Sequence, residues 1–249
     1  MLRQLNSFYE SNGISPVHFR CRWRSACCGE SAAFTEAKAS YVGPFFEERC
    51  LPRLLFLSLD PGGADPRPRE RTIDAVRRQN LAMDVEALHP KRHWYLTHEL
   101  AFALLRQFKA GLTVPDTRLY FAHVQSAKCS NRAGKEQASR TLFENCRPFI
   151  LPELKILKPD IVVTQGNPAV EAILKGGFAV RQHVRRTVNG ARYETAFLEL
   201  DRETRCLWLQ TYHPGARSHF HRQRTHCWPL YAMAVAGFWE AGTEARPSR

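Results

Sequence analysis

The stretch LLFLSLDPGG (54–63) decides the fold class, because a fully apolar strand here runs directly into an acidic turn. The run 53–59 is apolar on both faces, which is typical of a parallel strand with helices on either side. Asp60, Pro61 and Gly62 are ordinary turn residues, since proline presets φ and glycine accepts positive φ. Taken alone, the stretch predicts a buried strand and its end.

Further apolar runs repeat this pattern and alternate with segments of helical periodicity. We expect strands at 118–125, 160–166, 179–188, 194–200 and 205–212, with Asn189-Gly190 forming a hairpin turn. We expect helices at 72–88, 94–109, 135–157, 167–177 and near 227–240, the third of them kinked at Pro148 and Pro152. This alternation predicts an α/β fold, a three-layer α/β/α sandwich with a central, mainly parallel sheet.

One domain, 1–249, accounts for the whole chain, because no linker or internal repeat divides it. Within it we expect 1–50 to be an irregular N-terminal segment that contains cysteines, and 241–249 to be a disordered tail.

The charge balance favours a polyanionic partner. The 249 residues include 36 Lys and Arg against 24 Asp and Glu, which gives a net charge of +12. The apolar run YAMAVAGFW (231–239) is far shorter than the ~20 residues that span a bilayer. MLRQLNSFYESNG (1–13) lacks the apolar core of a secretory signal. We therefore expect a cytoplasmic monomer without a membrane partner.

In a parallel sheet of this kind, ligands bind at the carboxyl ends of the strands. Asp60, Gln125, Gly166 and His213 all stand at such ends. The sequence therefore predicts that these residues border one functional site.

Several blocks, in order, resemble the uracil-DNA glycosylase superfamily, most closely its iron–sulfur branch. LFLSLDPGG (55–63) is similar to the first motif, a strand and turn that families write as GQDPY, GMNPG or GEGPG. YFAHVQSAKCSNR (120–132) and ENCRPFILPELKILKPDIVVTQGNPAV (144–170) resemble that branch's strand with Lys-Cys and its cysteine-bearing helix. LQTYHPGAR (209–217) resembles the last motif, a strand followed by His-Pro and a small residue. The resemblance covers about 54–66 and 119–220 and implies a DNA glycosylase that acts on duplex or single-stranded DNA.

The chemistry of such an enzyme asks for residues of these kinds. The target nucleotide must leave the base stack, and the sugar then passes through an oxocarbenium-like transition state. A carboxylate near the sugar stabilises the cation and orients the attacking water, while the departing base needs a donor. The resemblance assigns the first role to Asp60 and the second to His213. Without it, His213 is an ordinary strand-end histidine before Pro214.

The residues expected around the base differ from the family pattern. Gln125 stands where the superfamily usually has Asn, and its amide matches a uracil or a cytosine edge. His123 is either a second contact or a core histidine, and Trp94 either a stacking face or core. Gly62 and Gly63 replace the Tyr of GQDPY, which leaves the C5 side of the base open.

The chain has eight cysteines, and the resemblance implies a four-iron–four-sulfur cluster for some of them. Cys129 and Cys146 match the last two ligands. The segment CRWRSACC (21–28) offers Cys21 with Cys28, or with Cys27 instead, at a spacing that departs from the family's C-x-x-C. Zinc and free thiols are the alternatives.

The basic stretch HPGARSHFHRQR (213–224) follows the last strand. In the superfamily this loop enters the DNA, so the resemblance implies Arg217 or Phe220 as a wedge and Arg222 and Arg224 as phosphate contacts. A solvated charged loop is the alternative.

We therefore expect a monofunctional DNA glycosylase that releases uracil or a C5-modified pyrimidine, because no motif places a lysine as a Schiff-base nucleophile. One alternative is a glycosylase that removes bulky bases, such as glucosylated hydroxymethylcytosine, from phage DNA as antiviral defence. A binder of modified or abasic DNA that cleaves nothing is the alternative of another class.

Overall fold

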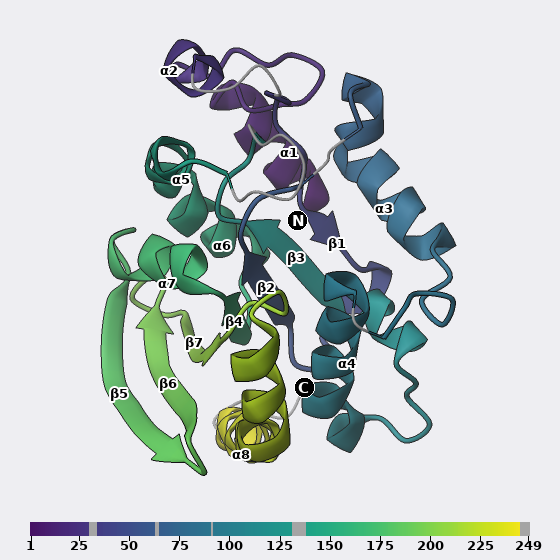
Figure 1. The fold of residues 1–249 in the computed structure, drawn as a ribbon, viewed down its shortest axis with the longest axis vertical. Helices are drawn as coiled ribbons and strands as arrows, with labels where there is room; N and C mark the ends of the chain where they lie inside the picture. The colour runs from purple at the N-terminus through teal and green to yellow at the C-terminus, as the bar shows by residue number, and fades with distance from the viewer. Residues whose placement is uncertain (30–33, 63–64, 91, 131–137, 245–249) are drawn as a thin grey trace.

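The computed structural model describes residues 1–29, 34–62, 65–90, 92–130 and 138–244. In these ranges seven strands form one mixed sheet in the order β1-β3-β2-β4-β7-β6-β5 (Figure 1). The central strands β3, β2, β4 and β7 are parallel, whereas β1, β6 and β5 join antiparallel. The strands are β1 (Tyr41–Val42), β2 (Leu54–Ser58), β3 (Phe121–Gln125), β4 (Ile161–Gln165), β5 (Ala179–Val188), β6 (Ala191–Glu199) and β7 (Arg205–Thr211).

Helices cover both faces of this sheet (Figure 1). They are α1 (Leu2–Ser11), α2 (Arg24–Cys28), α3 (Ile73–Ala82), α4 (His93–Leu105), α5 (Arg140–Cys146), α6 (Ile150–Leu157), α7 (Asn167–Leu174) and α8 (Arg217–Glu244). Short 3₁₀ helices lie at Pro44–Phe46, Pro68–Arg71, Arg106–Phe108, Pro115–Leu119 and Arg147–Phe149. No helix in the described ranges has the length and apolar content needed to cross a bilayer.

Strand β2 explains the layered arrangement. Leu54 and Phe56 pack into the apolar cluster beneath α4 and α8, and Leu55 and Leu57 pack into the cluster beneath α1, α5, α6 and α7. All four side chains are 0% exposed, and burying each contributes about 1.5–3 kcal/mol. The three-layer α/β/α fold with a mainly parallel centre is therefore confirmed.

The N-terminal segment is more ordered than the sequence analysis predicts. Leu5 and Tyr9 of α1 lie about one helical turn apart, and both are buried. Strand β1 pairs with β3 at the edge of the sheet. The helix predicted at 135–157 is divided into α5 and α6 by a 3₁₀ turn at Pro148, where proline removes a backbone donor. At the other end, α8 continues to Glu244, and 245–249 lie outside the described residues.

The last helix begins at Arg217 rather than near residue 227. Phe220, Gln223, Cys227 and Tyr231 recur at helical spacing and are all 0% exposed. Gln223 is buried because its Nε2 donates to the carbonyl of Arg192 at 2.7 Å. Because this core position holds a polar glutamine, the hydropathy pattern does not show that the helix begins before residue 227.

The carboxyl ends of the parallel strands meet at one edge of the sheet. Ser58 at the end of β2 pairs with Gln125 at the end of β3. Gln165 at the end of β4 pairs with Thr211 on β7. The residues that follow these strands therefore converge there.

Candidate active site

A pocket of about 610 Å³ opens at this edge, within the range typical of ligand sites. The structure brings six predicted residues to its walls: Asp60, Gly62, Trp94, His123, Gln125 and His213. Gly63 lies outside the described residues. Motif reasoning missed further wall residues, which are Lys38, Tyr41, Ser58, Gln79, Asn80 and His93.

Asp60 stands at the end of β2 with its carboxylate held by backbone donors. The N–H of Gly62 donates to Oδ1 at 2.7 Å, and the N–H of Ala138 donates to Oδ2 at 3.1 Å. Gly62 has φ +66°, a backbone conformation that favours glycine. The turn therefore does two things, since it ends the strand and fixes the carboxylate in the pocket.

His213 follows β7 on the other side of the pocket. Its Nδ1 accepts a hydrogen bond from the N–H of Gly215 at 3.1 Å, so in the neutral ring the proton is on Nε2. The ring stacks on His93, with centroids 4.8 Å apart and an interplanar angle of 17°. A Cβ on Gly166 would lie 3.0 Å from that of His213, so glycine permits this close approach.

A buried hydrogen-bond relay runs from α4 through the sheet. Thr97 Oγ1 donates to the carbonyl of His93 at 3.1 Å and therefore accepts from Gln165 Nε2 at 3.2 Å. Gln165 Oε1 then faces β2 and accepts from Ser58 Oγ at 2.5 Å. Because its proton is used there, Ser58 Oγ accepts from its next partner, His123, at 2.9 Å.

The relay ends at Gln125, in the wall of the pocket. His123 Nε2 carries the ring proton, so Nδ1 accepts from Gln125 Nε2 at 3.3 Å. Burial first, and then the neighbouring His93 and Lys38, lower the pKa of His123 well below its usual value, which keeps the ring neutral. Gln125 Oε1 is left buried and without a hydrogen-bond partner among the described residues. The pocket therefore presents an acceptor at this point.

Trp94 belongs to both the pocket and the core. It lines the cavity, and its ring meets that of His123 edge-on at 4.8 Å and that of His98 at 5.1 Å. Its indole ring therefore both walls the pocket and holds His123 in place.

Four cysteines line a narrow buried cavity at the other side of the sheet, namely Cys21, Cys27, Cys129 and Cys146. Cys28 is exposed and does not line this cavity, whereas its neighbour Cys27 is buried and does. Burial raises the pKa of Cys21, of Cys129 and of Cys146, the last to about 12. Across the described ranges, no group of three or more His, Cys, Asp or Glu side chains has the arrangement of a metal site.

Backbone and side-chain donors point at two of these sulfurs. The N–H of Lys128 donates to Cys146 Sγ at 3.2 Å, and Asn145 Nδ2 donates to Cys27 Sγ at 3.3 Å. Beside them, the Lys128 ammonium pairs with the fully buried Glu153. Removing one partner of such a pair leaves an uncompensated buried charge.

The basic stretch after His213 forms the first turns of α8, not a loop. Arg217 and Arg222 are exposed there, while Arg224 forms an ion pair with Glu99 of α4. Phe220 is 0% exposed and packs edge-on against Trp228 at 5.5 Å. The expectation that Phe220 forms a surface wedge is therefore corrected, because helical periodicity turns it into the core.

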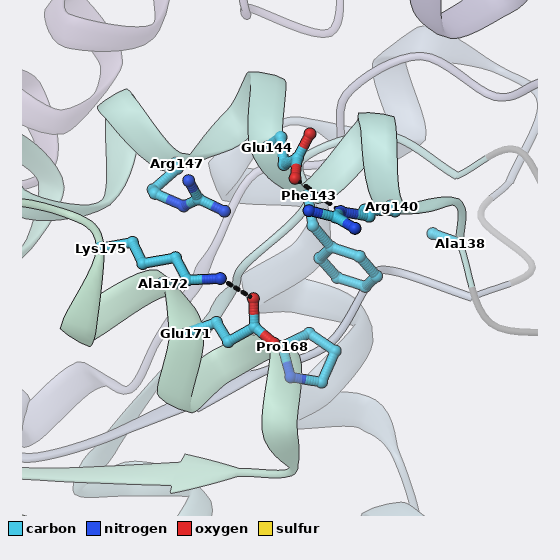
Figure 2. Close-up of a pocket in the computed structure, with 9 residues that line it drawn as sticks. All are labelled: Ala138, Arg140, Phe143, Glu144, Arg147, Pro168, Glu171, Ala172 and Lys175. Atoms are coloured by element: carbon cyan, nitrogen blue, oxygen red, sulfur yellow. Dashed lines mark hydrogen bonds and ion pairs between the residues drawn. The ribbon is translucent and has the colours of Figure 1, made fainter.

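A second hollow of about 290 Å³ lies between α5 and α7 (Figure 2). Its carboxylates pair with its own basic side chains, Arg140 with Glu144 at 2.7 Å and Lys175 with Glu171 at 2.8 Å. These ion pairs neutralise most of the charge in this hollow, so the Asp60 pocket is the stronger candidate for a functional site. Ala138 links the two regions, because it lines this hollow and its N–H donates to Asp60 in the other pocket.

A family model described as the uracil DNA glycosylase superfamily matches residues 48–233. The matched range holds Asp60, Gln125 and His213 and runs from β2 into α8. No curated protein matches the chain.

Proposed function

Because the chain belongs to the uracil DNA glycosylase superfamily, we propose that it is a hydrolytic DNA glycosylase that releases a pyrimidine from a flipped nucleotide. Membership of the superfamily supports glycosylase activity on DNA in general. The observation that carries the proposal further is the single pocket that holds Asp60, Gln125 and His213. An abasic site is the DNA product.

Asp60 acts at the sugar. Its carboxylate is held by two backbone N–H groups, so its orientation is set before substrate binds. From there it stabilises the oxocarbenium-like sugar and accepts the proton of the attacking water.

His213 acts at the departing base. When the bond between C1′ and N1 breaks, its electron pair moves onto the base and gives the two oxygens negative charge. The Nε2–H of His213, fixed by the bond from Gly215 to Nδ1, donates to the nearer of these oxygens, O2.

The base is held by its edge and its face. Gln125 Oε1 is the buried acceptor that a base N–H group satisfies. Trp94 walls the pocket. Gly62 leaves the C5 side open, and the pocket continues toward Gln79 and Asn80 of α3. Its size favours thymine-like or other C5-modified bases as well as uracil.

DNA contacts follow from the exposed arginines of α8. Arg217 and Arg222 lie on the turns that follow His213, where they reach phosphates beside the flipped nucleotide. Arg224 is occupied by Glu99 and is not assigned to DNA.

The proposal includes a four-iron–four-sulfur cluster held by Cys21, Cys27, Cys129 and Cys146. Four thiols line one cavity and N–H groups already point at two of the sulfurs, which supports this choice of ligands. A bound cluster would join the N-terminal segment to the core. Zinc or free thiols remain the alternatives.

Mass spectrometry of the bases released from a panel of DNAs tests the proposal. The panel contains uracil, thymine and glucosylated hydroxymethylcytosine. Release of at least one pyrimidine supports a glycosylase, and release of the glucosylated base supports an antiviral role against modified phage DNA. Binding to these DNAs without release of any base would favour the non-catalytic alternative.

A further inference from the structure

Lys38 enters the pocket from a segment that carries no family motif. The segment runs beside the continuation of β3, since the N–H of Lys38 donates to the carbonyl of Lys128 at 3.0 Å. On the other side of that continuation, Ala127 donates to the carbonyl of Leu59 at 3.0 Å. The backbone of Lys38 is therefore two strand spacings from that of Leu59, about 10 Å.

This placement fixes the order of groups across the pocket. Lys38 lies beyond β3 on the β1 side, Gln125 ends β3, and Asp60 follows β2. His213 follows β7, which is separated from β2 by β4. Lys38 and His213 therefore stand on opposite sides of the pocket, with Gln125 and Asp60 between them.

The Lys38 side chain is half-buried in the wall of the pocket. Among the residues that the structure describes, no carboxylate lies within ion-pair distance of its ammonium. Burial lowers its pKa. A charge that is partly withdrawn from water without an opposite charge is destabilising, and in a cleft such a group is a candidate for function.

We propose that Lys38 donates a hydrogen bond to O4 of the flipped base, where it selects 4-oxopyrimidines and stabilises the departing anion. The inference rests on the proposed glycosylase function and adds a second donor to that of His213. It gives a partner to the buried acceptor of Gln125 and a role to the cation that Lys38 brings to the same pocket.

The polar edge of a uracil-type base matches this order of groups. From the side of His213 the edge presents O2, N3–H and O4, which are an acceptor, a donor and an acceptor. The matching protein groups are the Nε2–H of His213, Oε1 of Gln125 and the ammonium of Lys38. Cytosine presents N3, an acceptor, to Gln125 Oε1 and an amino group to Lys38, so both contacts repel it.

The same placement gives Lys38 a part in bond cleavage. The electron pair of the broken C1′–N1 bond spreads over the base to O2 and O4. Donors at both oxygens stabilise that charge, and Lys38 keeps its proton throughout. The attacking water still gives its proton to Asp60, so the reaction balances without a covalent intermediate.

Single-turnover base release by Lys38→Met and Lys38→Arg tests the role. The substrates are duplexes that contain uracil or 5-fluorouracil, whose anion is the better leaving group. We expect Lys38→Met to slow uracil release about 10²-fold, as for the loss of one preorganised donor. We expect it to slow 5-fluorouracil release less, and Lys38→Arg to recover part of the rate. Lys155→Met, an exposed lysine on α6, is the matched control for loss of charge.

Several outcomes would overturn the proposal. A Lys38→Met enzyme with wild-type rates, or with the same loss on both bases, would contradict a contact to the departing base. A borohydride-trapped adduct with abasic DNA that disappears in Lys38→Met would make Lys38 a nucleophile instead. Wild-type protein that releases no base would overturn the proposed function as well, whereas normal release by both proteins would overturn only the role of Lys38.

Discussion

The backbone N–H of Ala138 donates to Oδ2 of Asp60 at 3.1 Å, although 78 positions separate the two residues. The carboxylate is therefore held from two directions, by its own turn through Gly62 and by the segment that leads into α5. Ser139 caps that helix through a bond from the N–H of Leu142 at 3.3 Å. The position of the Asp60 carboxylate thus depends on how α5 begins.

Ser58→Ala removes the middle of the relay that orients Gln125. Gln125 then loses its fixed orientation, so we expect the preference for uracil over cytosine to fall. The His123 Nε2–H loses its acceptor, which lowers the free energy of unfolding by about 1–3 kcal/mol. Relative kcat/KM on the two bases, together with urea unfolding, measures both effects. Ser126→Ala is the matched control, because Ser126 is equally buried at a neighbouring strand end and outside the relay.

His213→Ala removes the donor to O2. We expect base release to slow about 10²–10³-fold while DNA affinity stays within a factor of a few, because the donor acts only as negative charge develops. Single-turnover rates and binding curves measure the two quantities. His219→Ala, an exposed histidine on α8, should behave as wild type. Equal rates in His213→Ala and wild type would exclude His213 as the donor.

Arg217→Ala and Arg222→Ala should weaken DNA binding at all sequences. Each loses one phosphate contact, so the slope of log affinity against log salt concentration should fall by about 1. Arg224→Ala should leave that slope unchanged, because Arg224 pairs with Glu99. Fluorescence anisotropy over a salt series measures the slopes. Equal slopes in all three variants would remove the first turns of α8 from the DNA interface.

Cys27→Ser and Cys28→Ser separate the two candidate ligands. Only Cys27 lines the cavity with Cys21, Cys129 and Cys146, whereas Cys28 is exposed. Cys27→Ser should therefore lose iron and visible absorption, and Cys28→Ser should keep both. Iron and sulfide analysis of protein purified without air measures this. Wild-type protein without iron would contradict the cluster, and iron lost only in Cys28→Ser would contradict this ligand set.

The centre of the sheet could be predicted from the sequence because β2, β3, β4 and β7 are buried on both faces. The ends of these strands gave Asp60, Gln125 and His213, which the fold does bring to one pocket. The relay could not be found this way, since Ser58 and Gln165 meet only because β2 and β4 are neighbours in the sheet. The hydropathy of a segment predicts that it forms a strand, but not which strands lie beside it in the sheet.

Other residues were missed for local reasons. Lys38 lies in a segment without periodicity, and His93 is placed in the pocket by the first turn of α4. The resemblance places Phe220 in a DNA-entering loop, although its spacing to Cys227 and Tyr231 is helical and turns it into the core. The helical spacing of Leu2, Leu5 and Tyr9 likewise marks α1 in a segment expected to be irregular.

The most direct test of the central claim, that the Asp60 pocket cleaves the N-glycosidic bond, compares wild type with Asp60→Asn. Single-turnover release of the base that wild type prefers is measured beside DNA binding over a salt series. We predict that Asp60→Asn slows release about 10²–10⁴-fold, because the amide neither stabilises the sugar cation nor accepts the water proton. Salt-sensitive binding should persist. Release by Asp60→Asn at the wild-type rate would contradict the assignment of this pocket.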